Sequence, residues 1–193
     1  MNHPFASNEK VDPLMYHSLV GSQDQVWKNL RVKLSPVFTS GKMKLMLPLM
    51  KECASDLAVC VEKHSGDKIE IREIMKKYAV DIISSCAFGI NSYCLKNDKS
   101  EIMEVATKLA DFKSFVRNFS VFSFIFMPKF VDIFRLTFLD KSASNYLIDV
   151  FNNTLREREK KGILRNDLID LLNNLKHNEA FNENYKFGTS SDA

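Results

Sequence analysis

The single tryptophan of the chain stands four residues before an arginine, in the stretch WKNLRVKLSPVFTSGKMK (residues 27–44). Residues four apart lie on one face of an α-helix, so Trp27 and Arg31 are expected to point the same way. The indole N–H and the guanidinium are both donors, and a carboxylate or phosphate would accept hydrogen bonds from both. In the alternative arrangement, Trp27 packs in the core and Arg31 stacks on its ring, and spacing alone favours that alternative.

Cysteines and histidines are the other side chains that could bind metals or act as nucleophiles. The four cysteines are Cys53, Cys60, Cys86 and Cys94. They form no C-x-x-C pair, and no two of them sit close to histidines at zinc-ligand spacing. The four histidines are scattered singly along the chain. We therefore expect reduced thiols in a cytosol-facing protein and no metal site built from these residues.

Composition and charge narrow the class of protein further. The chain has 193 residues, of which 45% are hydrophobic and 26% charged, as in globular proteins rather than disordered ones. This length suits one domain or one piece of a larger one. The net charge of +3 is too small for a dedicated nucleic-acid binder. The N-terminal MNHPFASNEK has no apolar run, and the uncharged stretch of residues 118–128 is too short to span a bilayer.

The secondary-structure elements that must position these side chains are expected to be mainly helices, because apolar residues recur at helical spacing. A stripe of Val26, Leu30 and Leu34 predicts a helix that ends near Ser35-Pro36. A loop with a turn at Ser40-Gly41 is expected next, and DKIEI (residues 67–71) is compatible with a short strand. Further helices are expected over about 42–64, 71–88, 99–112 and 142–161, and a short last one follows Asn166 as its candidate N-cap.

Two segments depart from this regular pattern. Residues 112–139 hold nine of the fifteen phenylalanines and are expected to form short helical pieces around a proline turn. Residues 177–193 are polar and aperiodic, which indicates a disordered tail. The sequence therefore predicts a mainly α fold, a multi-helix bundle with little strand.

Several stretches together resemble one known family. Residues 12–44, DPLMYHSLVGSQDQVWKNLRVKLSPVFTSGKMK, resemble the region around the third long helix of the cytochrome P450 family, the haem-thiolate monooxygenases, in its insect microsomal xenobiotic-metabolising clan. The family pattern is Trp-x-x-x-Arg followed by Leu-x-Pro-x-Phe-(Thr/Ser)-Ser-Gly-Lys-(Met/Leu)-Lys, which this chain matches at 27–31 and 34–44. DIISSCAFGINSYCLKN (81–97) resembles the fifth helix and its exit, and RNDLIDLLNNLK (165–176) also matches. The resemblance covers about residues 12–176.

This resemblance implies a partial cytochrome P450 fold, about the B-to-H helices, within a single incomplete domain over residues 1–193. It implies that Trp27 and Arg31 donate to a haem propionate, and that Lys28 and Lys33 face an acidic NADPH-dependent reductase, with a solvated helix face as the alternative. It also implies oxidation of small apolar molecules at the cytosolic face of the endoplasmic reticulum membrane. The implied substrate-pocket residues lie in a segment that dips into the membrane surface, with ordinary core packing as the alternative; they are Phe112, Phe115, Phe119 and Phe122.

The departures from the family pattern matter equally. The family places its axial cysteine in Phe-x-x-Gly-x-x-x-Cys-x-Gly, and no cysteine here has that setting. The sequence also contains no Glu-x-x-Arg pair and no Ala-Gly-x-x-Thr helix. We therefore expect an internal fragment that is inactive by itself and binds no haem through a thiolate. The alternative function is a non-enzymatic helical module that binds an apolar ligand or a partner through the Phe-rich segment.

Overall fold

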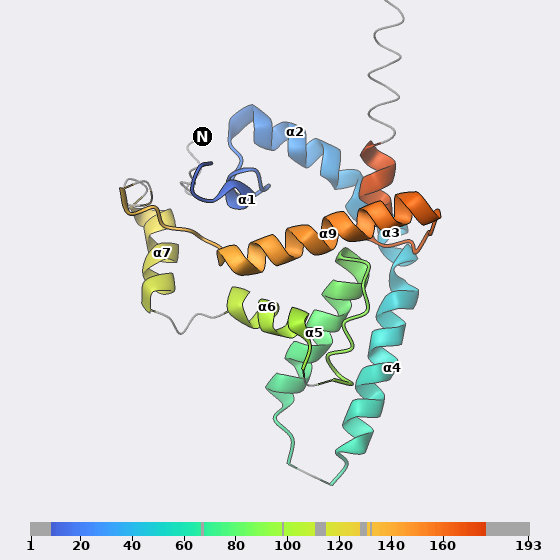
Figure 1. Cartoon of the computed structure of the whole chain (residues 1–193). Helices are drawn as coiled ribbons and strands as arrows, with labels where there is room; N and C mark the ends of the chain where they lie inside the picture. Colours follow the sequence, from blue (N-terminus) through green and yellow to red (C-terminus); the bar gives the residue numbers. More distant parts are fainter. Residues whose placement is uncertain are drawn as a thin grey trace, which may run out of the picture. The chain divides into compact units, whose positions relative to one another are not determined.

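The fold is built from helices. The computed structural model describes residues 9–66, 68–97, 99–110, 115–127, 131 and 133–176. The helices of Figure 1 are α1 Pro13–Tyr16, α2 Asp24–Leu34, the 3₁₀ turn η1 Ser35–Phe38, α3 Ser40–Leu45, α4 Leu47–Lys63, α5 Ile71–Ala87, α6 Glu101–Leu109, α7 Phe115–Phe126 and α9 Lys141–Lys161. A last helical segment covers 168–176. The described residues contain no strand, so the mainly α prediction is confirmed.

The structure differs from three local predictions. Residues 68–70 of the DKIEI stretch form no strand, and α5 begins at Ile71. The expected turn at Ser40-Gly41 is instead the start of α3. The long helix predicted from residue 42 is broken at Met46, which caps the end of α3 and the start of α4. Pro48 explains this break, because proline has no backbone N–H and is tolerated in the first turn of a helix but not farther inside.

The chain divides into two compact units, and one of the boundaries between them falls within α9. The first unit comprises residues 1–35 and 101–149, and the second comprises 36–100 and 150–193. In the second unit, α4 and α5 lie side by side as a helical hairpin (Figure 1). Its core joins η1, the α3–α4 junction, α5 and segment 168–176 through the buried side chains of Val37, Met46, Cys86 and Leu171.

The first unit is tied together by a buried aspartate and an aromatic contact. Asp12 accepts hydrogen bonds from the backbone N–H groups of Met15 at 3.1 Å and of Phe138 at 2.9 Å. The ring of Phe138 packs edge-on against the fully buried Phe124 of α7, with ring centroids 5.5 Å apart. These contacts connect the start of the chain and α7 to the segment that leads into α9.

Candidate functional site

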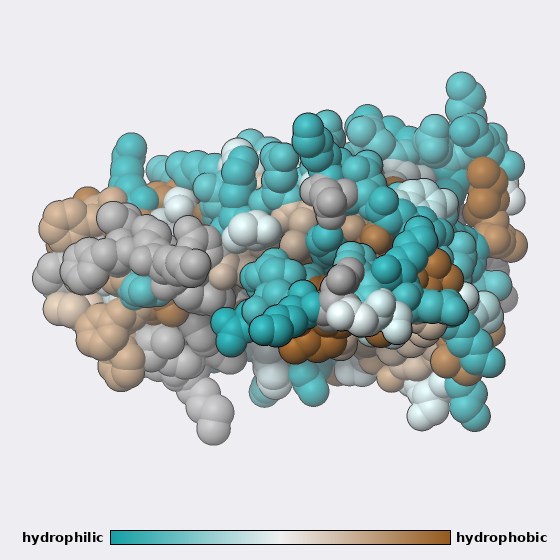
Figure 2. Space-filling model, turned by 90° about the horizontal axis from the view of Figure 1, so that it is seen from below, coloured by the Kyte–Doolittle hydropathy of each residue, from teal (hydrophilic) through white to brown (hydrophobic). Residues whose placement is uncertain are grey.

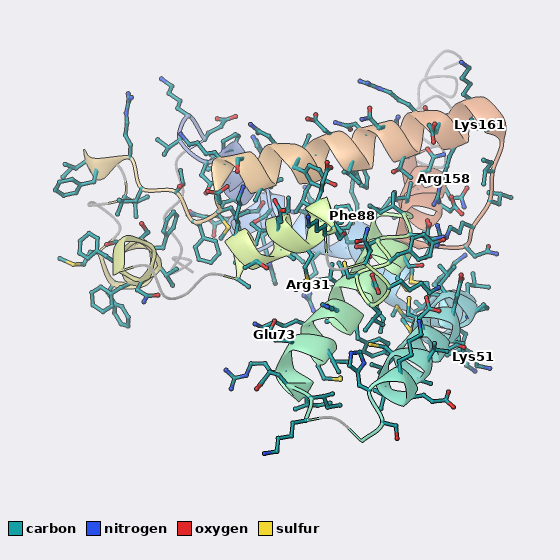
Figure 3. The ribbon with its side chains drawn as sticks, turned by 60° about the horizontal axis from the view of Figure 1, so that its bottom comes forward. Arg31, Lys51, Glu73, Phe88, Arg158 and Lys161 are labelled. Carbon is teal, nitrogen blue, oxygen red and sulfur yellow. The ribbon has the colours of Figure 1, made fainter. Side chains whose placement is uncertain are left out.

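Helix α2 brings Trp27 and Arg31 onto one face, as their spacing predicts. The guanidinium carbon of Arg31 lies over the indole ring, 5.9 Å from its centroid, a cation–π distance. Trp27 is half-buried and Arg31 is exposed, and α2 has no fully buried residue. The pair therefore combines elements of both expectations: Arg31 stacks on the ring, but the ring lies near the surface rather than in the core. This arrangement leaves the guanidinium accessible to an anion (Figure 3 labels Arg31).

The local sequence explains why α2 stops one turn after this pair. Pro36 follows Ser35, and the chain tightens into the 3₁₀ turn η1. The Ser35 hydroxyl donates to the Arg31 carbonyl at 2.7 Å, which satisfies one of the carbonyl groups left open at the helix end. The backbone at Arg31 is thus fixed by a side chain within the same turn.

Lys28 and Lys33 are exposed on the same helix. Each could face a negatively charged partner, and each is equally consistent with a solvated helix face. Their role toward a reductase stays a prediction.

The Phe-rich helix α7 has two contrasting faces. Phe119 and Phe122 are 40% and 50% exposed, whereas Phe124 is fully buried and Ser120 and Ser123 are also buried. The Phe122 ring packs on that of Phe126, with centroids 4.7 Å apart. Figure 2 shows apolar side chains gathered over α7, at the left of the view. Phe124 is therefore a core residue, while Phe119 and Phe122 form an apolar surface.

Two of the expected pocket residues cannot be placed as side chains. Phe112 lies outside the described residues, and Phe115 opens α7 with its side chain outside them. The assignment of Phe112, Phe115, Phe119 and Phe122 to a substrate pocket therefore stays a prediction.

The cysteines are free thiols, three of them buried. Burial, reinforced by the nearby Asp81 carboxylate, raises the pKa of the Cys53 thiol to about 11. Burial also raises the pKa of Cys86 and of Cys94. An axial haem ligand must be a thiolate, so these environments oppose that role. Within the described ranges, no group of three or more His, Cys, Asp or Glu side chains could hold a metal ion.

A buried ion cluster, which the sequence analysis missed, joins α9 to segment 168–176 (Figure 3 labels Arg158). Arg158 donates through Nη1 to Asp167 Oδ1 and to Asp170 Oδ1, each at 2.6 Å, and through Nη2 to Asp167 Oδ2. The exposed fractions of Arg158, Asp167 and Asp170 are 7%, 0% and 7%. Burial works against the charged guanidinium, but hydrogen bonds to the two aspartates hold the pKa of Arg158 above its ordinary value.

The same cluster reaches the end of α5. Gly89 has φ +65° and accepts hydrogen bonds through its carbonyl from Arg158 Nη2 at 3.3 Å and from Arg165 Nη1 at 3.0 Å. Arg165 also donates to Ser85 Oγ at 2.8 Å and to Asn91 Oδ1. Two arginines, one near the end of α9 and one before segment 168–176, thus bind a single carbonyl group that lies 69 and 76 residues away in sequence.

The aspartates also cap segment 168–176. Asp167 Oδ1 accepts the backbone N–H of Asp170 at 3.2 Å, and Asp170 Oδ2 accepts those of Arg165 and Asn166 at 2.6 and 2.7 Å. Asp167 is therefore the N-cap, and the prediction of Asn166 was wrong by one residue. The pattern D-x-x-D before an apolar run resembles a capping box and is the signal that could have identified it.

None of the helices among the described residues is long and apolar enough to cross a bilayer.

Comparison with known proteins identifies the relatives of this chain. A family model described as Cytochrome P450 matches residues 2–190. The chain is similar to Cytochrome P450 6k1 of Blattella germanica, with 40% identity over 173 residues, 89% of this chain and 33% of that protein. It is also similar to Probable cytochrome P450 6w1 of Drosophila melanogaster, with 34% identity over 183 residues, 94% of this chain and 35% of that protein. The chain spans about a third of the length of these curated relatives.

Proposed function

Because the chain belongs to the cytochrome P450 family, we propose that it supplies the propionate-binding part of a haem-dependent monooxygenase that oxidises small apolar molecules. The observation that carries this proposal is the pairing of Trp27 and the exposed Arg31 on one face of α2. When bound, haem supplies the iron at which dioxygen is activated, and the protein supplies binding and orientation.

The chemistry of the two side chains fits a haem propionate. A guanidinium donates to a carboxylate through two parallel N–H groups, and the indole N–H provides one further donor. The cation–π contact orders the Arg31 side chain over the indole, so less conformational entropy is lost when an anion binds. Arg31 and Trp27 would thus hold and orient the carboxylate edge of the porphyrin.

The axial thiolate does not fit the described cysteines. Cys53, Cys86 and Cys94 lie in surroundings that favour the protonated thiol, because burial raises the pKa of each. We propose that none of the three is the iron ligand, and that this chain by itself does not carry out the monooxygenase reaction.

The contacts with substrate, membrane and reductase that the family implies are assigned to exposed side chains of α2 and α7. We propose that the exposed Phe119 and Phe122 of α7 contact apolar substrate and the cytosolic surface of the endoplasmic reticulum membrane. We propose that Lys28 and Lys33 face the acidic surface of an NADPH-dependent reductase. We also propose that both compact units belong to one incomplete domain over residues 1–193, of which residues 12–176 resemble the family.

Fluorescence quenching by haem tests the propionate assignment, because Trp27 is the only tryptophan of the chain. Ferric haem should quench Trp27 emission saturably, and Arg31→Met should weaken that binding about tenfold or more, as expected for a hydrogen bond to a charged group. The dimethyl ester of haem, which has no propionate charge, should bind the unaltered chain as weakly as haem binds the Arg31→Met variant.

Lys28→Met is the matched control, since it removes one positive charge from the same helix at an exposed position. Its affinity for haem should stay within about twofold of the unaltered chain, because screening keeps distant surface charges weak. Equal binding of haem and its diester, or equal effects of the two substitutions, would show that haem binds elsewhere.

A further inference from the structure

Segment 168–176 has an apolar surface that does not by itself define one orientation. Five of its nine residues are aliphatic: Leu168, Ile169, Leu171, Leu172 and Leu175. Leu171 belongs to the core of the second unit, and Leu168, Leu172 and Leu175 pack against it. Ile169 is fully buried. The five side chains form an arc of about 160° around the helix at 100° per residue, and leucines of equal volume can exchange places. Apolar packing alone therefore allows more than one rotation of this helix.

The ion cluster distinguishes between those rotations. Asp167 and Asp170 stand one turn apart at the start of the helix, and both carboxylates accept from the single guanidinium of Arg158. Hydrogen bonds to a planar guanidinium are directional, unlike apolar contacts. A rotation of the helix by one residue, 100°, would take at least one carboxylate away from Arg158 and leave it buried without its partner.

The cluster contacts the chain at Gly89, two residues beyond the end of α5. A methyl group on the Gly89 Cα would lie 2.1 Å from Arg158 Nη2 and 2.7 Å from Asp167 Oδ2, so this close approach requires a residue without a side chain. Arg165 lies directly before the helix and donates to the same Gly89 carbonyl. With two arginines and two aspartates, the cluster is formally neutral, which suits its burial.

Buried ion pairs contribute little net stability compared with apolar residues of the same volume, because desolvation offsets the attraction between the charges. We propose that the Arg158–Asp167–Asp170 cluster fixes the rotational position of segment 168–176. The cluster determines which residue begins this helix and which of its faces packs toward α5. In this role the charges determine one structure, while the leucines supply most of the stabilising free energy.

Methyl NMR of leucine-labelled protein tests this proposal on the full 193-residue chain. The neutral triple variant Arg158→Met, Asp167→Asn, Asp170→Asn keeps the capping oxygens and removes the buried charges. We expect its urea midpoint to stay near that of the unaltered chain. We expect Leu168, Leu171, Leu172 and Leu175 to show more than one set of methyl signals, or exchange broadening, where the unaltered chain shows one set.

Two further variants make the result decisive. Arg158→Lys keeps the charge but loses the planar fork, and should speed amide exchange in 168–176 about tenfold while α4 is unchanged. Lys161→Met removes an exposed partner of Glu157, 3.3 Å away, and should change neither measurement. A single, unaltered set of leucine signals in the triple variant would overturn the proposal. A loss of the whole fold in that variant would assign the cluster to stability and would overturn it equally.

Discussion

Gly89 and Arg158 approach so closely that position 89 admits no side chain. An added Cβ would lie 2.1 Å from Arg158 Nη2, far inside van der Waals contact, and the φ of Gly89 is +65°. Arg158 cannot move aside without breaking its hydrogen bonds to Asp167 and Asp170. This contact makes one glycine a structural requirement for the buried cluster.

Gly89→Ala should therefore lower the free energy of unfolding by about 2–4 kcal/mol, from the clash and the left-handed backbone together. Urea unfolding followed by circular dichroism measures this change. Gly162→Ala is the matched control for the backbone alone, since Gly162 has φ +64° and no atom within 4 Å of the added methyl. Its cost should be about 1 kcal/mol. Equal costs at the two positions would show that the approach of Arg158 contributes nothing.

The buried carboxylate of Asp12 should be the most sensitive polar group of the first unit. Asp12 Oδ1 accepts from Met15 N at 3.1 Å, and Oδ2 accepts from Phe138 N at 2.9 Å. Asp12→Ala leaves the buried N–H of Met15 and the partly buried N–H of Phe138 without their acceptor, and we expect a loss of about 3 kcal/mol in the free energy of unfolding. Asp12→Asn retains one acceptor oxygen and should cost roughly half as much.

Asp140→Ala is a suitable comparison for the Asp12 variants. Asp140 is half-buried and caps α9 by accepting from Ala143 N at 2.9 Å, so its removal should cost about 1 kcal/mol. If Asp12→Ala costs no more than Asp140→Ala, the contact across 126 residues of sequence does not stabilise the unit.

Local periodicity predicted most of the helices, because the apolar stripe and the stop signals lie within the same few residues. The prediction of a helix over 71–88 matches α5, Ile71–Ala87, and that over 142–161 matches α9, Lys141–Lys161. The proximity of Trp27 and Arg31 follows in the same way from their spacing. Their proposed ligand came from the family resemblance.

The ion cluster was not predictable from local pattern. Residues 156–161 are all charged, and which of them turns inward depends on Gly89, 69 residues away from Arg158. Gly89 follows the end of α5, but its close approach to Arg158 exists only in three dimensions. Likewise, the helix at Ser40 follows from the burial of the flanking Val37 and Met46 in one core.

The cysteines should differ in reactivity toward iodoacetamide according to burial. Burial raises the pKa of Cys53 to about 11 and also raises that of Cys86 and Cys94, so few thiolates exist at pH 8. Cys60 is half-buried on α4 and should be alkylated first. Mass spectrometry of peptides from the folded chain, with urea-unfolded protein as the control, measures the order. Faster labelling of Cys53 than of Cys60 would contradict the structure.

The raised pKa of Cys53 also predicts a loss of stability in alkali. An unfolded cysteine loses its proton near its ordinary pKa of 9.0, whereas the folded Cys53 keeps its proton until about pH 11. The stabilisation from the neutral buried thiol is therefore complete below pH 9 and declines as the pH rises from 9 to 11. Cys53→Ala should flatten this decline in urea midpoints, at the cost of lower stability at pH 7. An unchanged slope would show that Cys53 does not titrate in this way.

Substitutions on the two faces of α7 should affect different properties. Changes on the exposed face should weaken membrane binding, and a change on the buried face should lower the stability of the fold. Phe122 and Phe126 are exposed and in ring contact, so replacing both with Ser should change the free energy of unfolding by less than about 1 kcal/mol. The same replacement should lower partition of the chain into phosphatidylcholine vesicles about tenfold or more, since each exposed ring would bury its surface in the interface. Phe124→Ala is the opposite case: Phe124 is fully buried, and we expect a cost of about 3–5 kcal/mol to the fold. Vesicle flotation at a temperature where all variants remain folded measures the partition. Equal partition of the Phe122→Ser, Phe126→Ser variant and the unaltered chain would exclude this face of α7 as the membrane contact.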